Sequence, residues 1–291
     1  MPKPSFNKAA IVGVGLIGGS IGMAILKRRL AKEVVGVGRR TTSLAAAKRF
    51  KAVTSATTNL EKGVADAELV FVCTPVGGIV DQVKAVGRIG NPSHRVLITD
   101  VGSTKAKIVR QLDEAGREAT WPTNVRFIGS HPIAGNEKRG PQHGSADLFV
   151  DRTVVITPTE HSLRDDVRRL KQFWSSLGAR VIVMTPEEHD TAMAAVSHLP
   201  HLLASAIAGA TPGQYVSLSG SGWHDTTRIA AGDASLWRQI LLANRKNVLD
   251  ALQGFDKRLA AFRKALEAGD EATLERLLSE AKKIRDAVGG K

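Results

Sequence analysis

The fold is decided by a short stretch near the N-terminus, Ile11-Val12-Gly13-Val14-Gly15-Leu16-Ile17-Gly18. Its glycines follow the spacing Gly-x-Gly-x-x-Gly, with an apolar strand pattern before them and a helical pattern after them. In this spacing the first glycine makes a tight turn, the second lets the backbone approach a pyrophosphate, and the third lets helix and strand pack closely. Unpaired N–H groups at the start of the helix suit phosphate oxygens. The stretch therefore predicts a βα unit that binds a nicotinamide dinucleotide.

Apolar runs alternate with helix-period segments up to about residue 185, which is typical of repeated βαβ units around a parallel sheet. The segment Thr185-Pro186-Glu187-Glu188 then has a capping residue, a proline at the first helical position and a glutamate three residues after the cap. It predicts the start of a long helix, and no strand pattern returns after it. We expect strands at 10–14, 34–37, 69–73, 96–99, 125–128, 154–156 and 181–184.

The fold class that follows is α/β: a Rossmann-type, doubly wound, mainly parallel sheet and then an all-α domain. We place the dinucleotide-binding domain at 1–185 and the helical domain, for substrate and dimer contacts, at 186–291. Within the latter, six apolar residues repeat at alternating intervals of four and three, which makes a coiled-coil-like seam. A helix packed in its own subunit and a homodimer interface both fit this pattern, and Gly269-Asp270 ends the helix. The seam residues are Val248, Leu252, Phe255, Leu259, Phe262 and Leu266.

The charge of +13 at pH 7 makes nucleic acid a candidate partner. Short basic groups such as Lys27-Arg28-Arg29 fall at an expected helix end, however, and the chain has one tyrosine for base stacking. We therefore expect no nucleic-acid partner, and a basic balance also suits a small anionic substrate. The uncharged run at 9–26 is broken by five glycines, so we expect no membrane span and a cytoplasmic protein. The single cysteine, Cys73, is expected in the core.

Cofactor preference is expected at the end of the second strand, Val37-Gly38-Arg39-Arg40-Thr41. An enzyme specific for NAD usually places an acid there, and none is present. Arg39 or Arg40 can pair with a 2′-phosphate, so we predict NADP in preference to NAD; an ordinary basic loop is the alternative. Cofactor contacts are also expected in the glycine turn, at Gly13, Gly15, Leu16, Ile17 and Gly18, and after later strands, at Thr74, Pro75 and Ser130.

Four segments are rich in functional groups, two of them directly after expected strands. They are Thr99-Asp100-Val101-Gly102-Ser103-Thr104-Lys105, Gly129-Ser130-His131-Pro132-Ile133-Ala134-Gly135-Asn136-Glu137, Ser197-His198-Leu199-Pro200-His201 and Asp225-Thr226-Thr227-Arg228-Ile229-Ala230. Together they resemble the prephenate and arogenate dehydrogenase family of tyrosine biosynthesis, over nearly the whole chain. The resemblance implies oxidative decarboxylation of a small anionic cyclohexadienyl substrate, either prephenate or arogenate, with NADP or NAD accepting the hydride.

The resemblance also implies roles for individual residues. His131 fits the general base, because a neutral imidazole has a pKa near the working pH. Ser103 is implied as the hydroxyl that orients His131 and the substrate, with a helix N-cap as the alternative. Arg228 is implied as the clamp on the substrate carboxylate, since its planar fork donates to two oxygens at once; a surface salt bridge is the alternative.

Two histidines three residues apart, His198 and His201, share one face of the expected helix, with Pro200 expected to kink it. We predict no metal, because no third ligand of suitable spacing is visible and hydride transfer needs none. The family pattern makes His201 a substrate-site residue, and His198 is equally compatible with a packed structural role. Glu137 and Trp237 match the family pattern less specifically, and the resemblance implies that they line the pocket and the dimer contact.

One departure from the family is His224, where many members have lysine, and it puts one substrate contact in doubt. Two other classes of protein remain as alternatives. A β-hydroxyacid or imino-acid reductase shares the cofactor domain and the helical second half but lacks the His-Pro-Ile-Ala-Gly segment. An NADP-sensing regulator that binds nucleic acid would use the positive charge and needs neither His131 nor Arg228.

Overall fold

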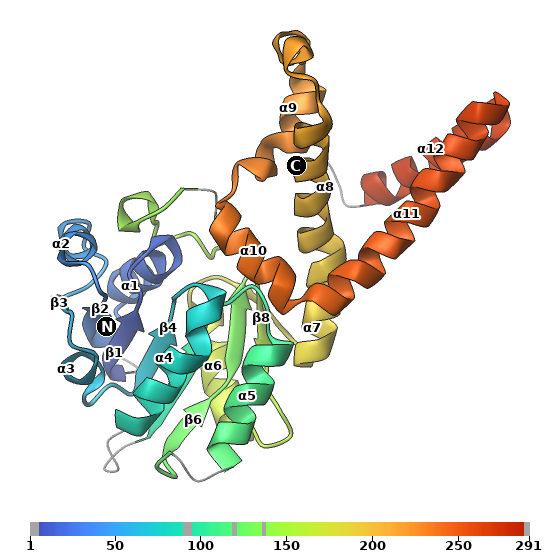
Figure 1. The fold of residues 1–291 in the computed structure, drawn as a ribbon. Coiled ribbons are helices and arrows are strands. Elements are labelled where there is room, and N and C mark those ends of the chain that lie inside the picture. The colour runs from blue at the N-terminus through green and yellow to red at the C-terminus, as the bar shows by residue number, and fades with distance from the viewer. Residues whose placement is uncertain (1–5, 90–94, 118–120, 136–137, 288–291) are drawn as a thin grey trace. The chain divides into compact units, whose positions relative to one another are not determined.

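The computed structural model describes residues 6–89, 95–117, 121–135 and 138–287 (Figure 1). The chain divides into two compact units, Met1–Asn244 and Arg245–Lys291. The first unit contains every strand. The expected boundary after residue 185 lies inside it, where the last strand gives way to helices, and that boundary stays a prediction.

A six-stranded sheet forms the centre of the first unit, and all its neighbouring strands are parallel. Its strand order, β3-β2-β1-β4-β5-β6, is the doubly wound order, with the switch point between β1 and β4. The predicted Rossmann-type fold is confirmed. The strands are β1 (Phe6–Val12), β2 (Ala31–Val37), β3 (Ser55–Thr57), β4 (Leu69–Val72), β5 (Val96–Asp100) and β6 (Val125–Phe127).

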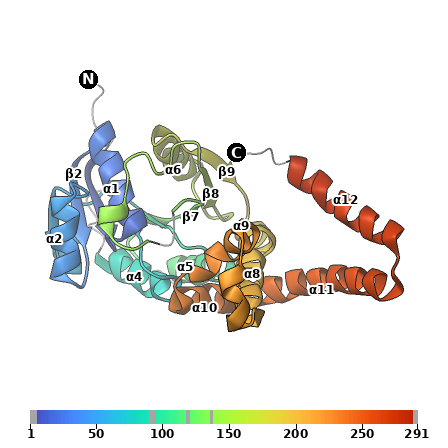
Figure 2. The same ribbon diagram turned by 90° about the horizontal axis from the view of Figure 1, so that it is seen from above.

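Both faces of this sheet are buried because apolar residues occupy successive positions of each strand and alternate between the two faces. In β1, Ala9 and Ile11 join one core while Ala10 and Val12 join the other. Helices α1, α2 and α6 cover the first core, and α3, α4 and α5 cover the second (Figure 2). The helices are α1 (Leu16–Arg28), α2 (Thr41–Arg49), α3 (Leu60–Val64), α4 (Val76–Ile89), α5 (Ala106–Arg117) and α6 (Arg164–Ser176).

A second sheet of three strands, β7 (Gly129–Pro132), β8 (Thr153–Thr157) and β9 (Arg180–Val183), follows the first. Strand β7 pairs antiparallel with β8, and β8 pairs parallel with β9. Only one residue separates β6 from β7, so the chain passes directly from one sheet to the other. Strands β3 and β7 were not expected. The structure places His131 inside β7, opposite Val155, whereas the sequence pattern places it after the expected strand 125–128 and outside any strand.

The helical part of the first unit begins as predicted. Thr185 caps α7 (Pro186–Met193) through Glu188 N, and the Glu188 carboxylate accepts from Thr185 N at 2.8 Å. A π-helical turn, Ala194–His198, joins α7 to α8 (Leu199–Ala210), so the helix widens before Pro200 and tolerates the missing N–H. Two shorter helices complete the unit, α9 (Ser221–Thr227) and α10 (Ala234–Ala243).

Within the described residues, the stretch Pro186–Ala210 alone is long and apolar enough to cross a membrane by length and composition. This is weak evidence for a span, since the core helix of a soluble protein passes the same test. Its buried side chains include His189, Asp190 and His198, which suit a protein interior that provides polar partners. The glycine-broken run at 9–26 forms β1, the turn and α1.

The second unit consists of α11 (Arg245–Ala268) and α12 (Glu271–Ala287). Gly269 ends α11 with a φ of 62°, and Asp270 accepts from Thr273 N at 3.0 Å to cap α12. The predicted end of the helix is therefore confirmed. Arg258 ties the two helices together by donating to Leu277 O and to the carboxylate of Glu280.

Candidate active site

The glycine turn has the geometry that the cofactor prediction requires. Gly13 adopts a φ of 100°, and a Cβ there would lie 2.6 Å from Cys73 O. A Cβ on Gly18 would overlap Gly13 O, which is why α1 packs so closely on β1. At Gly15, by contrast, no described atom lies within 4 Å of the position of a Cβ. The turn therefore leaves one open approach to its backbone, and it lies at Gly15.

The surroundings of this turn also fit a dinucleotide. Helix α1 begins at Leu16, and no described side chain caps its first N–H groups. Thr74, which follows β4 across the switch point, has a buried hydroxyl without a partner among the described residues. Gly135, just beyond β7, packs against Ile17 and Leu16, where a Cβ would lie 3.3 and 3.5 Å from their side chains. Free donors and an open backbone thus meet at the carboxyl ends of β1 and β4.

Arg39 and Arg40 are exposed between β2 and α2. The first turn of α2 contains no acid, and no described side chain caps its N-terminus. A positive loop beside an uncapped helix start suits an anionic group.

A buried ion pair, Lys105 with Asp100, lies at the end of β5. Both side chains are fully buried, and Asp100 also accepts from Gly102 N at 2.8 Å and from Ser130 N at 3.2 Å. Burial lowers the pKa of Lys105, and the charge of Asp100 opposes that shift. Ser130 is fully buried, and its hydroxyl donates to Asp100 O at 2.6 Å. These contacts give Ser130 a part in joining β5 to β7; its cofactor role stays a prediction.

His131 lies at one end of a chain of hydrogen bonds. Its Nδ1 is 2.9 Å from His189 Nε2, and His189 Nδ1 is 2.8 Å from Asp190 Oδ1. Burial lowers the pKa of His131 well below its ordinary 6.5, and the nearby His189, Lys105 and His198 lower it further. The imidazole of His131 is therefore neutral at pH 7 and can accept a proton.

A second group of rings continues from this chain. The Asn244 amide donates to Asp190 O at 2.6 Å and contacts His198 Nδ1 at 3.1 Å. His198 meets the indole of Trp237 edge to face, and His201 stacks on it with ring centroids 3.5 Å apart. Burial lowers the pKa of His198 to about 4, so it too is neutral. Its buried position and its bond to Asn244 fit a packed histidine.

His201 and Trp237 line a cavity of about 410 Å³. His201 has a buried Nδ1 that finds no partner among the described residues. Ala230 and Gly232 also line the cavity, and they follow Arg228 in the 3₁₀ turn Arg228–Ala231. The structure thus brings His201, Trp237 and the turn that carries Arg228 to one place, with the Arg228 side chain exposed.

Three further residues named in the sequence analysis are Ser103, Glu137 and His224. Ser103 is half-buried before α5, and the first N–H groups of that helix, from Lys105 and Ala106, donate to Asp190 instead. The N-cap alternative for Ser103 is therefore not what the structure shows. Glu137 lies outside the described residues. His224 is exposed and contacts Ser219 Oγ at 3.2 Å.

Sequence reasoning missed three residues of this site: His189, Asp190 and Asn244. The adjacent His-Asp pair in the first turns of α7 was visible, but its partner His131 lies 58 residues earlier. Among the described residues, no group of three or more histidine, cysteine or acidic side chains is placed to hold a metal.

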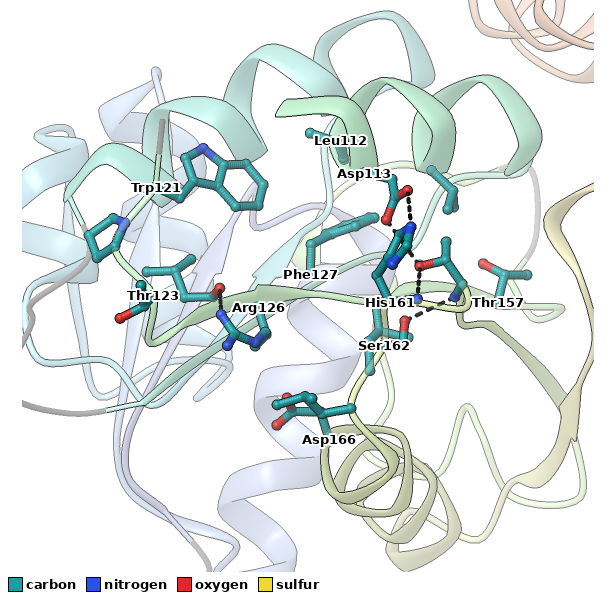
Figure 3. Close-up of a pocket in the computed structure, with 17 residues that line it drawn as sticks. Leu112, Asp113, Trp121, Thr123, Arg126, Phe127, Thr157, His161, Ser162 and Asp166 are labelled. Atoms are coloured by element: carbon teal, nitrogen blue, oxygen red, sulfur yellow. Dashed lines mark hydrogen bonds and ion pairs between the residues drawn. The ribbon is translucent and has the colours of Figure 1, made fainter. Parts of the chain in front are cut away.

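A different cavity, of about 360 Å³, lies between α5, β6 and the segment after β8 (Figure 3). Asp113, Phe127, His161 and Asp166 line it, and Thr159 donates to Asp113 at 3.0 Å. None of the residues predicted for catalysis or substrate binding lines this cavity, so it is separate from the site around His131.

Comparisons with known proteins agree on one family. Residues 21–183 match the nucleotide-binding domain of prephenate dehydrogenase, and residues 185–280 match its dimerization domain. Prephenate dehydrogenase of Bacillus subtilis is 31% identical over 96% of this chain and 75% of its own length. Cyclohexadienyl dehydrogenase of Zymomonas mobilis is 30% identical over 97% of this chain and 96% of its own.

A solved structure resembles the whole chain. Prephenate dehydrogenase from A. aeolicus, in complex with hydroxyphenyl propionate and NAD+, superposes with a TM-score of 0.88 at 29% identity. The match covers 97% of this chain and 98% of that one. These findings favour the dehydrogenase prediction and give no support to the reductase or regulator alternatives.

Proposed function

This chain belongs to the prephenate dehydrogenase family, and we propose that it is an NAD(P)-dependent enzyme that oxidatively decarboxylates prephenate or arogenate. One observation supports this most directly. A half-buried, neutral imidazole, His131, stands on the strand whose continuation packs on the glycine turn, and hydrogen bonds and ring contacts link it to the cavity lined by His201 and Trp237.

The chemistry requires a base, a carboxylate clamp and a place for the nicotinamide. When bound, NAD(P)+ accepts a hydride from the ring carbon that bears the hydroxyl. His131 takes the proton of that hydroxyl as the C–O bond gains double-bond character, a role that typically contributes about 10²- to 10⁴-fold. The bond between the ring and its carboxylate group then breaks. Carbon dioxide leaves, the electron pair of that bond stays with the ring, and the ring becomes aromatic.

Substrate binding is proposed for the helical side of the site. The Arg228 guanidinium holds a carboxylate by two parallel bonds, and His201 and Trp237 form the wall against which the ring lies. Ser103 and Glu137 are retained as proposed contacts, because the family resemblance implies them. The carboxylate groups of such a substrate are negatively charged, which suits a chain of net charge +13.

A preference for NADP is proposed from Arg39 and Arg40. One charge-assisted bond to a 2′-phosphate is worth about 1.5–3 kcal/mol, or roughly 10- to 100-fold in affinity. Replacing both arginines by alanine is expected to lower kcat/KM for NADP by that factor and to leave NAD almost unaffected. Lys48→Ala, at the far end of α2, is the matched control. A wild-type preference for NAD would refute this proposal.

A homodimer formed through the C-terminal helices is also proposed. Leu259 and Leu266 of the predicted seam are 46% and 66% exposed in the second unit, and the matched family model is described as a dimerization domain. Sedimentation of the wild type is expected to give a dimer. Leu266→Glu is expected to weaken it, while Lys264→Glu, at an exposed position beside it on α11, serves as a charge control.

The decisive assay is reduction of NADP and NAD with prephenate and with arogenate as substrates. Turnover with either substrate supports the proposed reaction, and the absence of turnover with each of the two substrates refutes it. His131→Asn is expected to lower kcat by at least 10²-fold while cofactor affinity stays near normal. Arg228→Gln is expected mainly to raise KM for the anionic substrate, and an effect confined to kcat would contradict the clamp.

A further inference from the structure

Two side chains behind His131 have no part in the mechanism described above. His189 and Asp190 are adjacent in α7, and their side chains are 0% and 2% exposed. They connect to His131 in series, with His189 between the other two. A fixed series of this kind determines where each proton lies.

The carboxylate of Asp190 determines which nitrogen of the His189 ring carries a proton. An ionised carboxylate only accepts hydrogen bonds, and this one accepts from Lys105 N at 2.7 Å and Ala106 N at 3.0 Å. Because these backbone donors hold both oxygens, the ring nitrogen that faces Oδ1 must also be a donor. His189 therefore carries its proton on Nδ1, and its Nε2 is left with a lone pair.

The same argument passes to the next ring. His189 Nε2 now accepts, so the neutral His131 must donate from Nδ1. Its own Nε2 is then the nitrogen without a proton. Of the two neutral forms of His131, only this one has its lone pair on the nitrogen that points away from His189.

We propose that Asp190 and His189 are positioning residues that hold His131 in the form with an unprotonated Nε2, ready to accept the substrate proton. This inference rests on the proposed role of His131 as the base. The arrangement also favours the product of that step, because the imidazolium formed at His131 keeps its Nδ1–H bond to His189, which in turn faces the negative charge of Asp190.

The series is held in place from three sides. The capping box at Thr185 starts α7 one turn before His189. The N-terminus of α5 fixes the carboxylate of Asp190, and the Asn244 amide holds its backbone carbonyl at 2.6 Å. Asp190 thus caps α5 in addition to facing His189, so a test must separate the capping function from the positioning function.

A pair of substitutions at His189 makes that separation, because Asp190 stays intact in both. In His189→Gln the amide oxygen still accepts from His131 Nδ1, whereas in His189→Leu nothing accepts. We expect kcat to fall by at least about 10²-fold in the leucine variant with KM nearly unchanged, and by less than about tenfold in the glutamine variant. Asp190→Asn is expected to lower kcat further, toward the roughly 10⁴-fold seen when an orienting carboxylate is lost.

A direct measurement of the proton is the second arm. In protein labelled with ¹⁵N in histidine, ring nitrogen shifts report which nitrogen of His131 is protonated, independently of turnover. We expect a protonated Nδ1 and a bare Nε2 in the wild type and in His189→Gln, and a mixture or the reverse in His189→Leu.

Either of two results overturns the inference: a protonated Nε2 in the neutral wild-type ring, or equal kcat in folded glutamine and leucine variants that retain the wild-type Tm within a few degrees. Failure of the proposed function gives a different pattern: either the wild type turns over neither substrate, or His131→Asn keeps full turnover, while the ring shifts of wild-type His131 still show the bare Nε2. If Asp190→Asn does not fold, the His189 pair carries the test alone.

Discussion

Two glycines of the cofactor turn, Gly15 and Gly18, are predicted to respond differently when each is replaced by alanine: Gly18 loses stability and Gly15 loses cofactor affinity. At Gly18 the new Cβ would overlap Gly13 O and lie 3.0 Å from the Ile11 side chain. Overpacking of this kind typically costs about 1–3 kcal/mol, and the upper end applies because Gly13 O is a backbone carbonyl in a tight turn and cannot move aside easily. Alanine regains about 1 kcal/mol of helix propensity, which leaves a net loss of about 2 kcal/mol.

Gly15 is the matched control for stability and the test case for binding. No described atom lies within 4 Å of its Cβ position, and its φ of −83° is open to alanine. We expect the free energy of unfolding to change by less than about 0.5 kcal/mol. A methyl group there would, however, hold the pyrophosphate away from the first N–H groups of α1, and we expect the cofactor Kd to rise at least about tenfold, or about 1.4 kcal/mol.

Thermal unfolding and cofactor titration of both variants provide the assay. At about 2–4 °C per kcal/mol, Gly18→Ala is expected to lower Tm by about 4–8 °C, while Gly15→Ala keeps the wild-type Tm within about 2 °C. If Gly15→Ala binds the cofactor as tightly as the wild type, the assignment of the pyrophosphate to this turn is wrong. A wild-type Tm for Gly18→Ala would contradict the packing argument.

Three further predictions concern the pH profile, the buried ion pair and the capping box. Burial lowers the pKa of His131, so the neutral base persists as the pH falls. The value of kcat/KM should therefore stay constant down to pH 6.5 and decline only at lower pH. A decline that begins at or above pH 6.5 would contradict the assignment of His131 as the base. Lys105→Met leaves Asp100 buried without its counter-charge, and it should lower the free energy of unfolding measured by chemical denaturation by about 3–5 kcal/mol. Adding Asp100→Asn should recover part of that loss. A double variant less stable than Lys105→Met alone would disprove the coupling. Thr185→Ala removes the cap of α7 and should cost about 1 kcal/mol with KM unchanged, which melting curves and initial rates will check.

The sheet could be predicted from the sequence wherever a strand is long, apolar and buried. Strands β1, β2, β4 and β5 each contain a run of three or more consecutive uncharged, mostly apolar residues, which suits a parallel sheet covered on both faces. Strand β7 could not be predicted in this way. Its four residues, Gly-Ser-His-Pro, include a proline and lack any β-branched aliphatic side chain, so they read as a loop. It is a strand because it pairs with β8.

The residues of the candidate site also fall into two groups, those that could be predicted from the sequence and those that could not. The glycine turn was predicted from its own spacing, whereas His131, His201, Trp237 and Arg228 were predicted because their segments resemble those of a known family. His189, Asp190 and Asn244 were not, because each acts through a partner far away in the chain.

The sequence by itself determined that this chain forms a dinucleotide-binding α/β sheet followed by helices, and that it carries the residues of a dehydrogenase. The fold follows from local patterns, which are residue spacing, strand composition and helix caps, and the dehydrogenase residues follow from short segments that resemble a known family. Only the tertiary structure decided what stands behind His131, that α5 is capped by a carboxylate from α7, and which glycine of the turn is left open. These depend on how α7 packs against β7 and α5, and a contact between segments distant in sequence leaves no periodic signal in either one.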